Sequence, residues 1–178
     1  MPANDSPPPA TGDYGAKTLR EAVRTARRAP RTGPEPFGDP LSGILLVAEP
    51  VAGAVSVGAN GGVVEALRRS LAAVKLDGAY VTWPHSHLLE EILSLEPGAL
   101  VAVGPVAARA IDSLDYPLAK TTFSESPEGS WFAWTKGTSG LKLPALAPAL
   151  EDDAAKRRFW RAFLAMRALT PEEAFRRP

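Results

Sequence analysis

Two histidines flank a serine at His85, Ser86 and His87, a combination that could serve nucleophilic or metal chemistry. A serine hydrolase also needs a carboxylate that orients the base and a strained turn that presents the nucleophile, and the sequence contains no GxSxG. Two histidines alone do not make a usual zinc site, and the chain has no cysteine to complete one. We therefore predict that these residues begin a helix over 86–95, and we expect no metal and no cofactor.

A glycine-rich turn over 58–62 could cradle a phosphate group, because apolar residues recur at helical spacing directly after it. It lacks the lysine and the serine or threonine of a P-loop, and it does not match GxGxxG. We predict a turn in which Asn60 caps the following helix.

One carboxylate, Glu49, follows the apolar run 44–47. Continuous apolar β-formers predict a strand that is covered on both faces, and ligands of open α/β sheets bind at the carboxyl edge of such strands. Glu49 is therefore a candidate for a weak general base at this edge.

The chain must supply further strands and helices to position these residues. Short apolar runs predict strands over 79–82 and 99–103, and helices are expected after Asn60, over 86–95 and after Gly104. This alternation predicts a parallel sheet. Weaker strand candidates follow at 121–123, 131–134 and 141–143, with a loop over 145–150. The expected fold is α/β, a three-layer α/β/α sandwich with a short, mainly parallel, four-stranded sheet.

The last helix is predicted from the acidic residues 151–153, which favour a helix N-terminus through its dipole. Large apolar side chains are expected to anchor this helix: Phe159, Trp160, Phe163, Leu164 and Met166. Thr170 precedes Pro171, with glutamate three residues on, which predicts a capped final turn.

Composition divides the chain into a tail over 1–13, a basic helix with a proline-rich connection over 14–42, a domain over 43–168 and a tail over 169–178. The first segment is polar and proline-rich, so we predict that it is disordered. Basic residues near the two ends are candidates for binding DNA or a protein partner: Arg20, Arg24, Arg27, Arg28, Lys156, Arg157 and Arg161. For the helix expected over 14–28, a solvated face of a packing helix is the more common explanation of such residues.

Overall charge and cysteine content exclude several classes of protein. Twenty basic and twenty acidic side chains give no net field toward nucleic acid. The absence of cysteine excludes disulfides, thiolate catalysis and cysteine-ligated metal clusters. No long apolar span or signal sequence appears at the N-terminus, so we expect a cytoplasmic protein without membrane contact.

The order of these segments resembles the uracil-DNA glycosylase superfamily, and most closely its bacterial and archaeal iron-sulfur class. In that class a CxxCP segment precedes a strand ending in GEAPG, followed by a glycine turn, a YVTN strand, an IVALG-like strand and an HPA motif. The corresponding segments here are 26–30, 44–53, 58–62, 80–83, 100–104 and 147–149, with Lys156 and Trp160 in the last helix. The resemblance covers roughly residues 19–166 and implies a glycosylase-like sheet.

The departures from this family fall on its chemistry. Both cysteines of the CxxC are alanines, so the cluster cannot form. Trp83 replaces the asparagine that reads the uracil edge in the family, and Ala147 replaces the histidine that stabilises the uracil anion. Glu49 remains. The resemblance thus implies a former pocket at Ala48, Pro50, Trp83 and Pro148. It also implies degenerate catalytic positions at Glu49, Trp83 and Ala147.

The stretch from 146 to 160 also resembles the psi subunit of the bacterial DNA polymerase III clamp loader, an adaptor with an inactive glycosylase-like sheet. The expected function is therefore a catalytically inactive glycosylase-like adaptor or accessory factor in DNA replication or repair, with a protein partner from that machinery. Two alternatives remain: a weakly active glycosylase that hydrolyses the N-glycosidic bond of uracil in DNA, and a DNA-binding module without chemistry.

Overall fold

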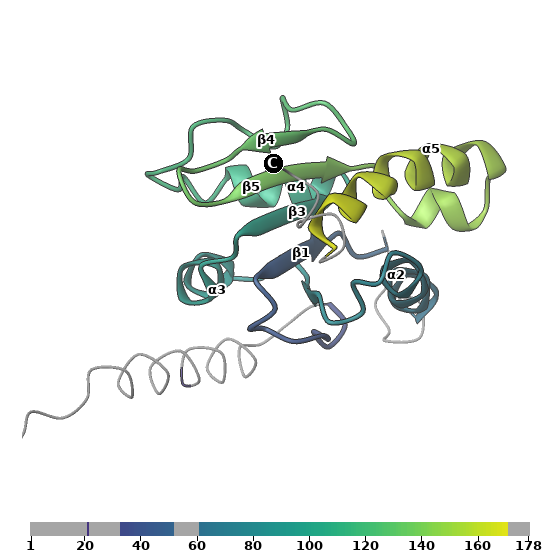
Figure 1. Ribbon diagram of the computed structural model, residues 1–178, viewed down its shortest axis with the longest axis horizontal. Helices are drawn as coiled ribbons and strands as arrows, with labels where there is room; N and C mark the ends of the chain where they lie inside the picture. Colours follow the sequence, from purple (N-terminus) through teal and green to yellow (C-terminus); the bar gives the residue numbers. More distant parts are fainter. Residues whose placement is uncertain (1–20, 22–32, 52–60, 171–178) are drawn as a thin grey trace, which may run out of the picture.

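The computed structural model describes residues 21, 33–51 and 61–170. Its sheet contains five strands in the order β2-β1-β3-β5-β4 (Figure 1). The elements in chain order are β1 Ile44–Ala48, α2 Gly61–Ala73, β2 Tyr80–Thr82, α3 Leu88–Leu95, β3 Ala99–Val103, α4 Pro105–Asp112, β4 Trp131–Ala133, β5 Ser139–Leu143, the 3-10 helix η2 Ala147–Leu150, α5 Asp153–Phe163 and the 3-10 helix η3 Leu164–Leu169.

The three strands expected near residues 44, 79 and 99 are adjacent and parallel, as predicted. Leu45 of β1 is in register with Tyr80 of β2 on one side and with Leu100 of β3 on the other. β5 continues the parallel sheet beyond β3, with Leu100 opposite Gly140. The carboxyl ends of these four strands therefore lie along one edge of the sheet.

The prediction of four strands is wrong, because β4 adds a fifth that pairs antiparallel with β5. A tight hairpin turn joins the two strands, and in it the N–H of Trp134 donates to the carbonyl of Thr138 at 3.1 Å. The strand expected over 121–123 is a turn instead. The loop expected over 145–150 contains η2.

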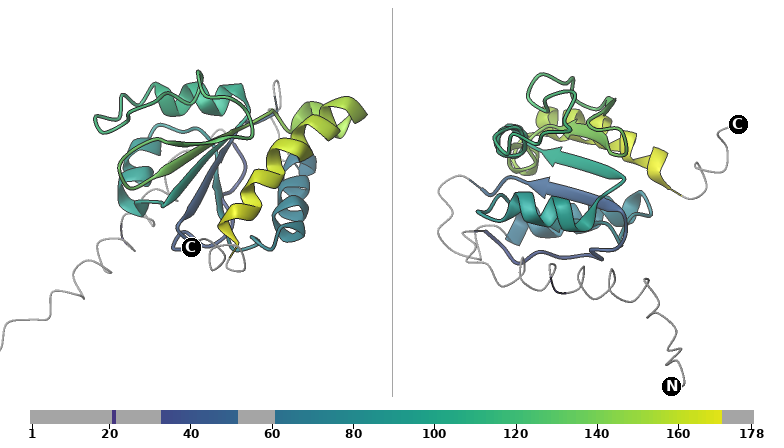
Figure 2. Two further views of the ribbon diagram at one scale, coloured as in Figure 1. Left: turned by 45° about the horizontal axis from the view of Figure 1, so that its top comes forward. Right: turned by 90° about the vertical axis from the view of Figure 1, so that its left-hand side faces the viewer.

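Helices cover both faces of the sheet (Figure 2). Because successive side chains of a strand point to opposite faces, Leu46 and Ala48 of β1 join the core under α2 and α5, whereas Leu45 and Val47 join the core under α3 and α4. This double coverage explains why β1 reads as an uninterrupted apolar run.

The outer edge of β2 is covered by the segment that precedes β1. The N–H of Phe37 donates to the carbonyl of Val81 at 3.1 Å, and the N–H of Val81 donates back to the carbonyl of Phe37 at 2.8 Å. The Phe37 ring is buried in the core. Residues 33–42, which the sequence analysis assigns to the connection, thus contribute to the core of the domain.

Two expectations about inward-facing helix residues are wrong. Phe159, Phe163 and Met166 are buried as predicted, but Trp160 is 38% exposed and Leu164 is 39% exposed. The anchoring face of α5 is therefore narrower than its apolar composition indicates.

Candidate functional site

The carboxyl edge of the parallel strands is the place where the candidate residues meet. Glu49 follows β1, Trp83 follows β2 and Gly104 follows β3 directly. In an open α/β sheet this edge is the usual location of a ligand. The contacts of Glu49 and Trp83 at this edge therefore determine whether either residue could bind a ligand or act as a base.

Glu49 caps helix α4. Its carboxylate Oε2 accepts a hydrogen bond from the backbone N–H of Val106 at 2.8 Å, in the first turn of the helix. Its own backbone N–H donates to the carbonyl of Val103 at 3.1 Å, which holds the residue against the end of β3. A negative charge at a helix N-terminus is stabilised by the unpaired N–H groups and the dipole of the helix.

Gly104 makes this contact sterically feasible. It has a φ of +97°, and a Cβ atom at this position would overlap the Glu49 carboxyl group. A residue with a side chain would be strained here and would also displace the carboxylate.

Burial raises the pKa of the Glu49 carboxyl, because desolvation disfavours its charged form. The hydrogen bond from Val106 and the positive charge of Arg109 act in the opposite direction, and burial is the larger effect. Glu49 is thus a half-buried carboxyl group that is hydrogen-bonded to the N-terminus of α4.

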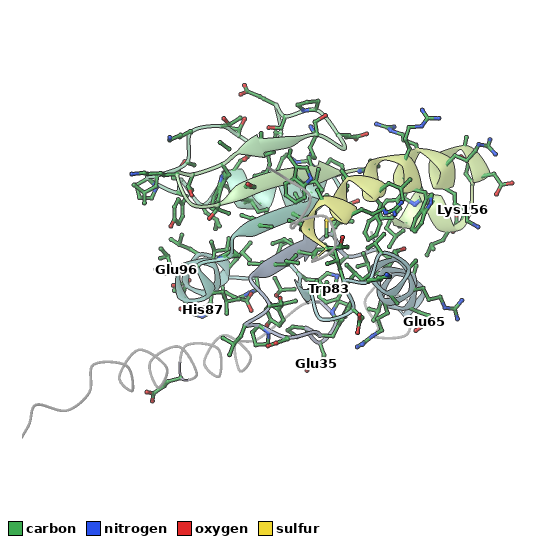
Figure 3. The ribbon with its side chains drawn as sticks, viewed as in Figure 1. Glu35, Glu65, Trp83, His87, Glu96 and Lys156 are labelled. Carbon is green, nitrogen blue, oxygen red and sulfur yellow. The ribbon has the colours of Figure 1, made fainter. Side chains whose placement is uncertain are left out.

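Trp83 is part of the core and only 2% exposed, and Figure 3 shows it in the interior of the molecule. The centroids of the Trp83 and Phe37 rings are 6.1 Å apart. A Cβ atom added to Gly33 would lie 3.1 Å from the Cβ of Trp83, so the backbone of Gly33 packs closely against this side chain. Within the described residues, its buried indole N–H has no hydrogen-bond partner. The side chain therefore fills space next to the carboxyl edge.

The other residues of the expected pocket are placed differently from one another. Ala48 is fully buried in β1, whereas Pro50 and Pro148 are exposed. Ala147 begins η2 and packs against the same core as Trp83. Neither Trp83 nor Ala147 offers a side-chain group that could bind a base edge or stabilise an anion at this edge, because the indole N–H is buried and the methyl group is apolar.

A buried polar network that was not predicted from the sequence joins β2, α3 and His85. The carboxylate of Glu91 in α3 accepts hydrogen bonds from Tyr80 Oη at 2.8 Å and Thr82 Oγ1 at 3.0 Å. His85 Nε2 lies 2.7 Å from the same carboxylate, and its Nδ1 accepts from the N–H of His87, so Nε2 is the protonated nitrogen that donates to Glu91.

This network does contain the histidine–carboxylate pair that the sequence did not reveal. The side chains of His85 and Glu91 are each only 2% exposed, so a substrate cannot reach them. Glu91 shares the inward helical stripe of Leu88, Ile92 and Leu95, and this spacing is the signal that could have identified it. The hydrogen bonds of Tyr80 and Thr82 to Glu91 hold β2 to α3, and the buried histidine–carboxylate pair does not constitute a hydrolase site.

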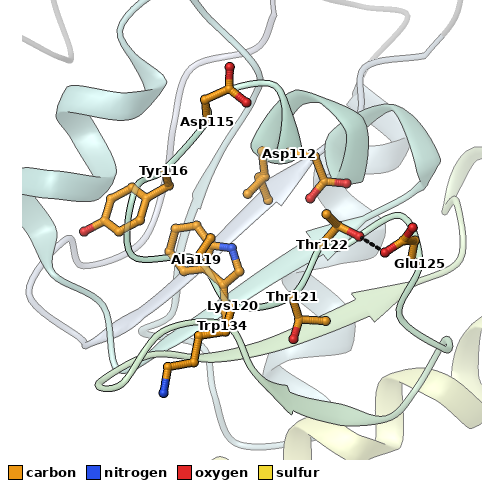
Figure 4. Close-up of a pocket in the computed structure, with 10 residues that line it drawn as sticks. Asp112, Asp115, Tyr116, Ala119, Lys120, Thr121, Thr122, Glu125 and Trp134 are labelled. Carbon is orange, nitrogen blue, oxygen red and sulfur yellow. Dashed lines mark hydrogen bonds between the residues drawn. The ribbon is translucent and has the colours of Figure 1, made fainter.

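A polar pocket of about 340 Å³ opens at the C-terminal end of α4, opposite the end that Glu49 caps (Figure 4). Asp112 in its wall accepts hydrogen bonds from the N–H groups of Phe123 and Ser124 at 2.7 and 2.9 Å. Thr122 donates to Glu125 at 2.9 Å. These acidic side chains therefore organise the 122–126 turn, away from the carboxyl edge.

The candidate basic residues of the last helix, Lys156, Arg157 and Arg161, are exposed on α5. The arginines at 20, 24, 27 and 28 lie outside the described residues, as do residues 52–60 with most of the glycine-rich turn. Among the residues that the structure describes, no three histidine, aspartate or glutamate side chains are grouped so that they could hold a metal ion. None of the described helices is both long and apolar enough to cross a membrane.

The sequence matches no protein-family model, and it matches no curated protein.

Proposed function

We propose that this chain is a catalytically inactive protein of the uracil-DNA glycosylase fold that acts as an adaptor or accessory factor in DNA replication or repair. Its partner on this proposal is a protein of that machinery, in the cytoplasm. Support comes from the family-like order of the sequence segments and from a sheet whose four parallel strands lie between helices on both faces, the arrangement of a three-layer sandwich.

One observation carries the proposal: the two sheet-edge residues that would do the chemistry are both engaged in the structure of the domain. The Glu49 carboxylate is bound to the N-terminus of α4, and Trp83 is packed in the core. Glycosylases flip the base out of the duplex, bind its edge through hydrogen bonds and stabilise charge on the leaving base. The loss of one such preorganised donor costs about 100-fold or more in rate.

A uracil-excision assay tests the proposal. Single-stranded and double-stranded oligonucleotides that carry one uracil are incubated with the full chain, with its Glu49→Gln variant and with an active glycosylase as positive control. We expect no excision by either form of this chain above the level without protein. Robust excision by the wild type that disappears in Glu49→Gln would contradict the proposal.

The weakly active glycosylase is the second candidate, and the environment of Glu49 favours it. Burial raises the pKa of this carboxyl group, which makes it a stronger base once ionised. The same assay at several pH values separates the two candidates, because only the enzyme yields a rate that depends on Glu49.

The DNA-binding module is the third candidate, and it is favoured by the exposure of Lys156, Arg157 and Arg161 on one helix. Its binding to a labelled oligonucleotide without uracil would weaken steeply with added salt, because phosphate contacts release counterions. The adaptor predicts no such binding at physiological salt.

A further inference from the structure

An apolar groove of about 430 Å³ runs between α2 and the first half of α5. Ala66 and Ser70 line it from α2, Leu150 lines it from η2, and Trp160 lines it from α5 together with Lys156 and Arg157. In Figure 3, Lys156 lies near the beginning of α5, on the side of the view where α2 lies. The groove is separate from the carboxyl-edge positions Glu49 and Trp83.

Small residues on α2 keep the groove open. Gly62, Ala66 and Ser70 follow one another at intervals of four, so they lie on one face of the helix. A Cβ atom at Gly62 would lie 3.5 Å from Cδ1 of Leu150, which shows how closely η2 approaches this face. Larger side chains on this face would fill the space that the groove occupies.

Two large apolar side chains border the groove without being buried in it. Leu150 is 48% exposed and Trp160 is 38% exposed. The Trp160 ring stacks on Phe163, with 5.7 Å between the ring centroids and an angle of 15° between the planes, so Phe163 supports one face of the ring. Partly exposed tryptophan residues beside an apolar groove are typical of the centres of protein interfaces.

The cations at the rim are free to pair with a partner. Within the described residues neither Lys156 nor Arg157 forms a salt bridge, whereas Arg158 of the same helix pairs with Glu128 at 2.7 Å. Among the described residues, no acidic side chain lines the groove. Nearby, Glu65 pairs with Arg69 at 2.8 Å and Asp152 accepts from the N–H of Ala155 as the cap of α5, whereas Glu151 and Asp153 are exposed outside the lining.

We propose that this groove binds an amphipathic peptide segment of a partner protein. Bulky apolar side chains of the segment enter between α2 and α5, and its carboxylates pair with Lys156 and Arg157. The inference rests on the proposed adaptor function and names the docking surface and the chemistry of the partner. A peptide fits this groove better than a nucleic acid, because six of its nine lining residues are apolar and only Lys156 and Arg157 could contact phosphate groups.

Selection from a displayed library of random peptides on the immobilised full chain tests the partner chemistry. The expected consensus contains an aromatic or large aliphatic residue with aspartate or glutamate on either side. A peptide of the consensus sequence is then synthesised and titrated against the protein. A consensus without acidic residues, or a selection that returns no binding sequence, would overturn the proposal.

Matched variants test the location. The single variant Trp160→Glu and the double variant Lys156→Glu/Arg157→Glu should each lower the affinity for the consensus peptide by about tenfold or more. The control variants Leu118→Glu and Arg167→Glu change exposed residues outside the groove lining and should leave the affinity unchanged. Equal affinity in all variants would place the binding elsewhere and defeat the inference. Circular dichroism of each variant confirms that the fold is retained.

A labelled single-stranded oligothymidine serves as the competing probe. If it binds at physiological salt and displaces the peptide in a manner that depends on Trp160, the groove is a nucleic-acid site and the inference fails. These outcomes differ from a failure of the proposed function, which the uracil-excision assay reports and which does not depend on Trp160.

Discussion

Glu49 and Val106, 57 residues apart in the sequence, are joined by a 2.8 Å hydrogen bond from the backbone N–H of Val106 to the carboxylate of Glu49. This contact ties the end of β1 to the start of α4 across the end of β3. The one acidic residue at the sheet edge that could act as a base therefore serves as a helix cap supplied from a distant part of the chain.

Loss of this cap should destabilise the domain. Glu49→Ala is expected to lower the free energy of unfolding by about 0.5–2 kcal/mol, the usual cost of removing a side chain that caps a helix. Glu49→Gln should lose less, because its amide oxygen can still accept from Val106. Urea denaturation measures the effect, with the exposed Glu35→Ala as control. Equal stability of Glu49→Ala and Glu35→Ala would contradict the capping role.

The same carboxyl group should make stability depend on pH in a defined direction. Burial raises the pKa of Glu49 in the folded protein, so between the ordinary glutamate pKa and the raised value the folded state binds more protons than the unfolded state. Stability attributable to Glu49 is then fully present below the ordinary pKa and declines as pH rises through the raised pKa.

Denaturation of the wild type and of Glu49→Gln at a series of acidic pH values checks this direction. The wild type should lose stability relative to the variant as pH rises through the window and should then reach a plateau. A difference that grows in favour of the wild type with rising pH would mean that the hydrogen bond from Val106 and the charge of Arg109 outweigh burial.

Replacement of the buried tryptophan should cost far more than replacement of the exposed one. Trp83→Ala would leave a cavity in the core and is expected to destabilise the domain by about 3–5 kcal/mol. Trp160→Ala removes a side chain at the surface and should cost about 1 kcal/mol or less. Thermal or urea unfolding compares the two variants. A small loss in Trp83→Ala would contradict the role of this side chain in the core.

Glu91 should be more important for stability than its sequence neighbour Glu90. Glu91→Ala removes the acceptor shared by Tyr80, Thr82 and His85, and the disruption of such a buried network is expected to cost about 3–5 kcal/mol. Glu90→Ala, at an exposed position of the same helix, should change stability by about 0.5 kcal/mol or less. Similar effects of the two substitutions in urea denaturation would refute the structural role of the network.

The sequence by itself determined the parallel centre of the fold. The runs at 44–47, 79–82 and 99–103 are apolar on both faces of a strand, and the helices between them have local periodicity, so neighbouring residues alone indicate the elements and their order. It also determined the start of α5, where Asp152 is a cap that acts within one turn. The hairpin of β4 and β5 was only partly predicted, since short strands carry a weak local signal.

Only the tertiary structure decided which of the candidate residues are exposed for binding and which are engaged in contacts within the domain. The apolar stripe of α5 does not specify how much of it a neighbour covers, and Trp160 is left partly exposed because α2 presents the small residues Ala66 and Ser70 to the groove that it lines. The sequence marks Glu49 and Trp83 as edge residues, but their state depends on Val106, Phe37 and Gly33, which reach them from other parts of the chain. Such contacts arise from the packing of the whole domain, and no local pattern encodes them.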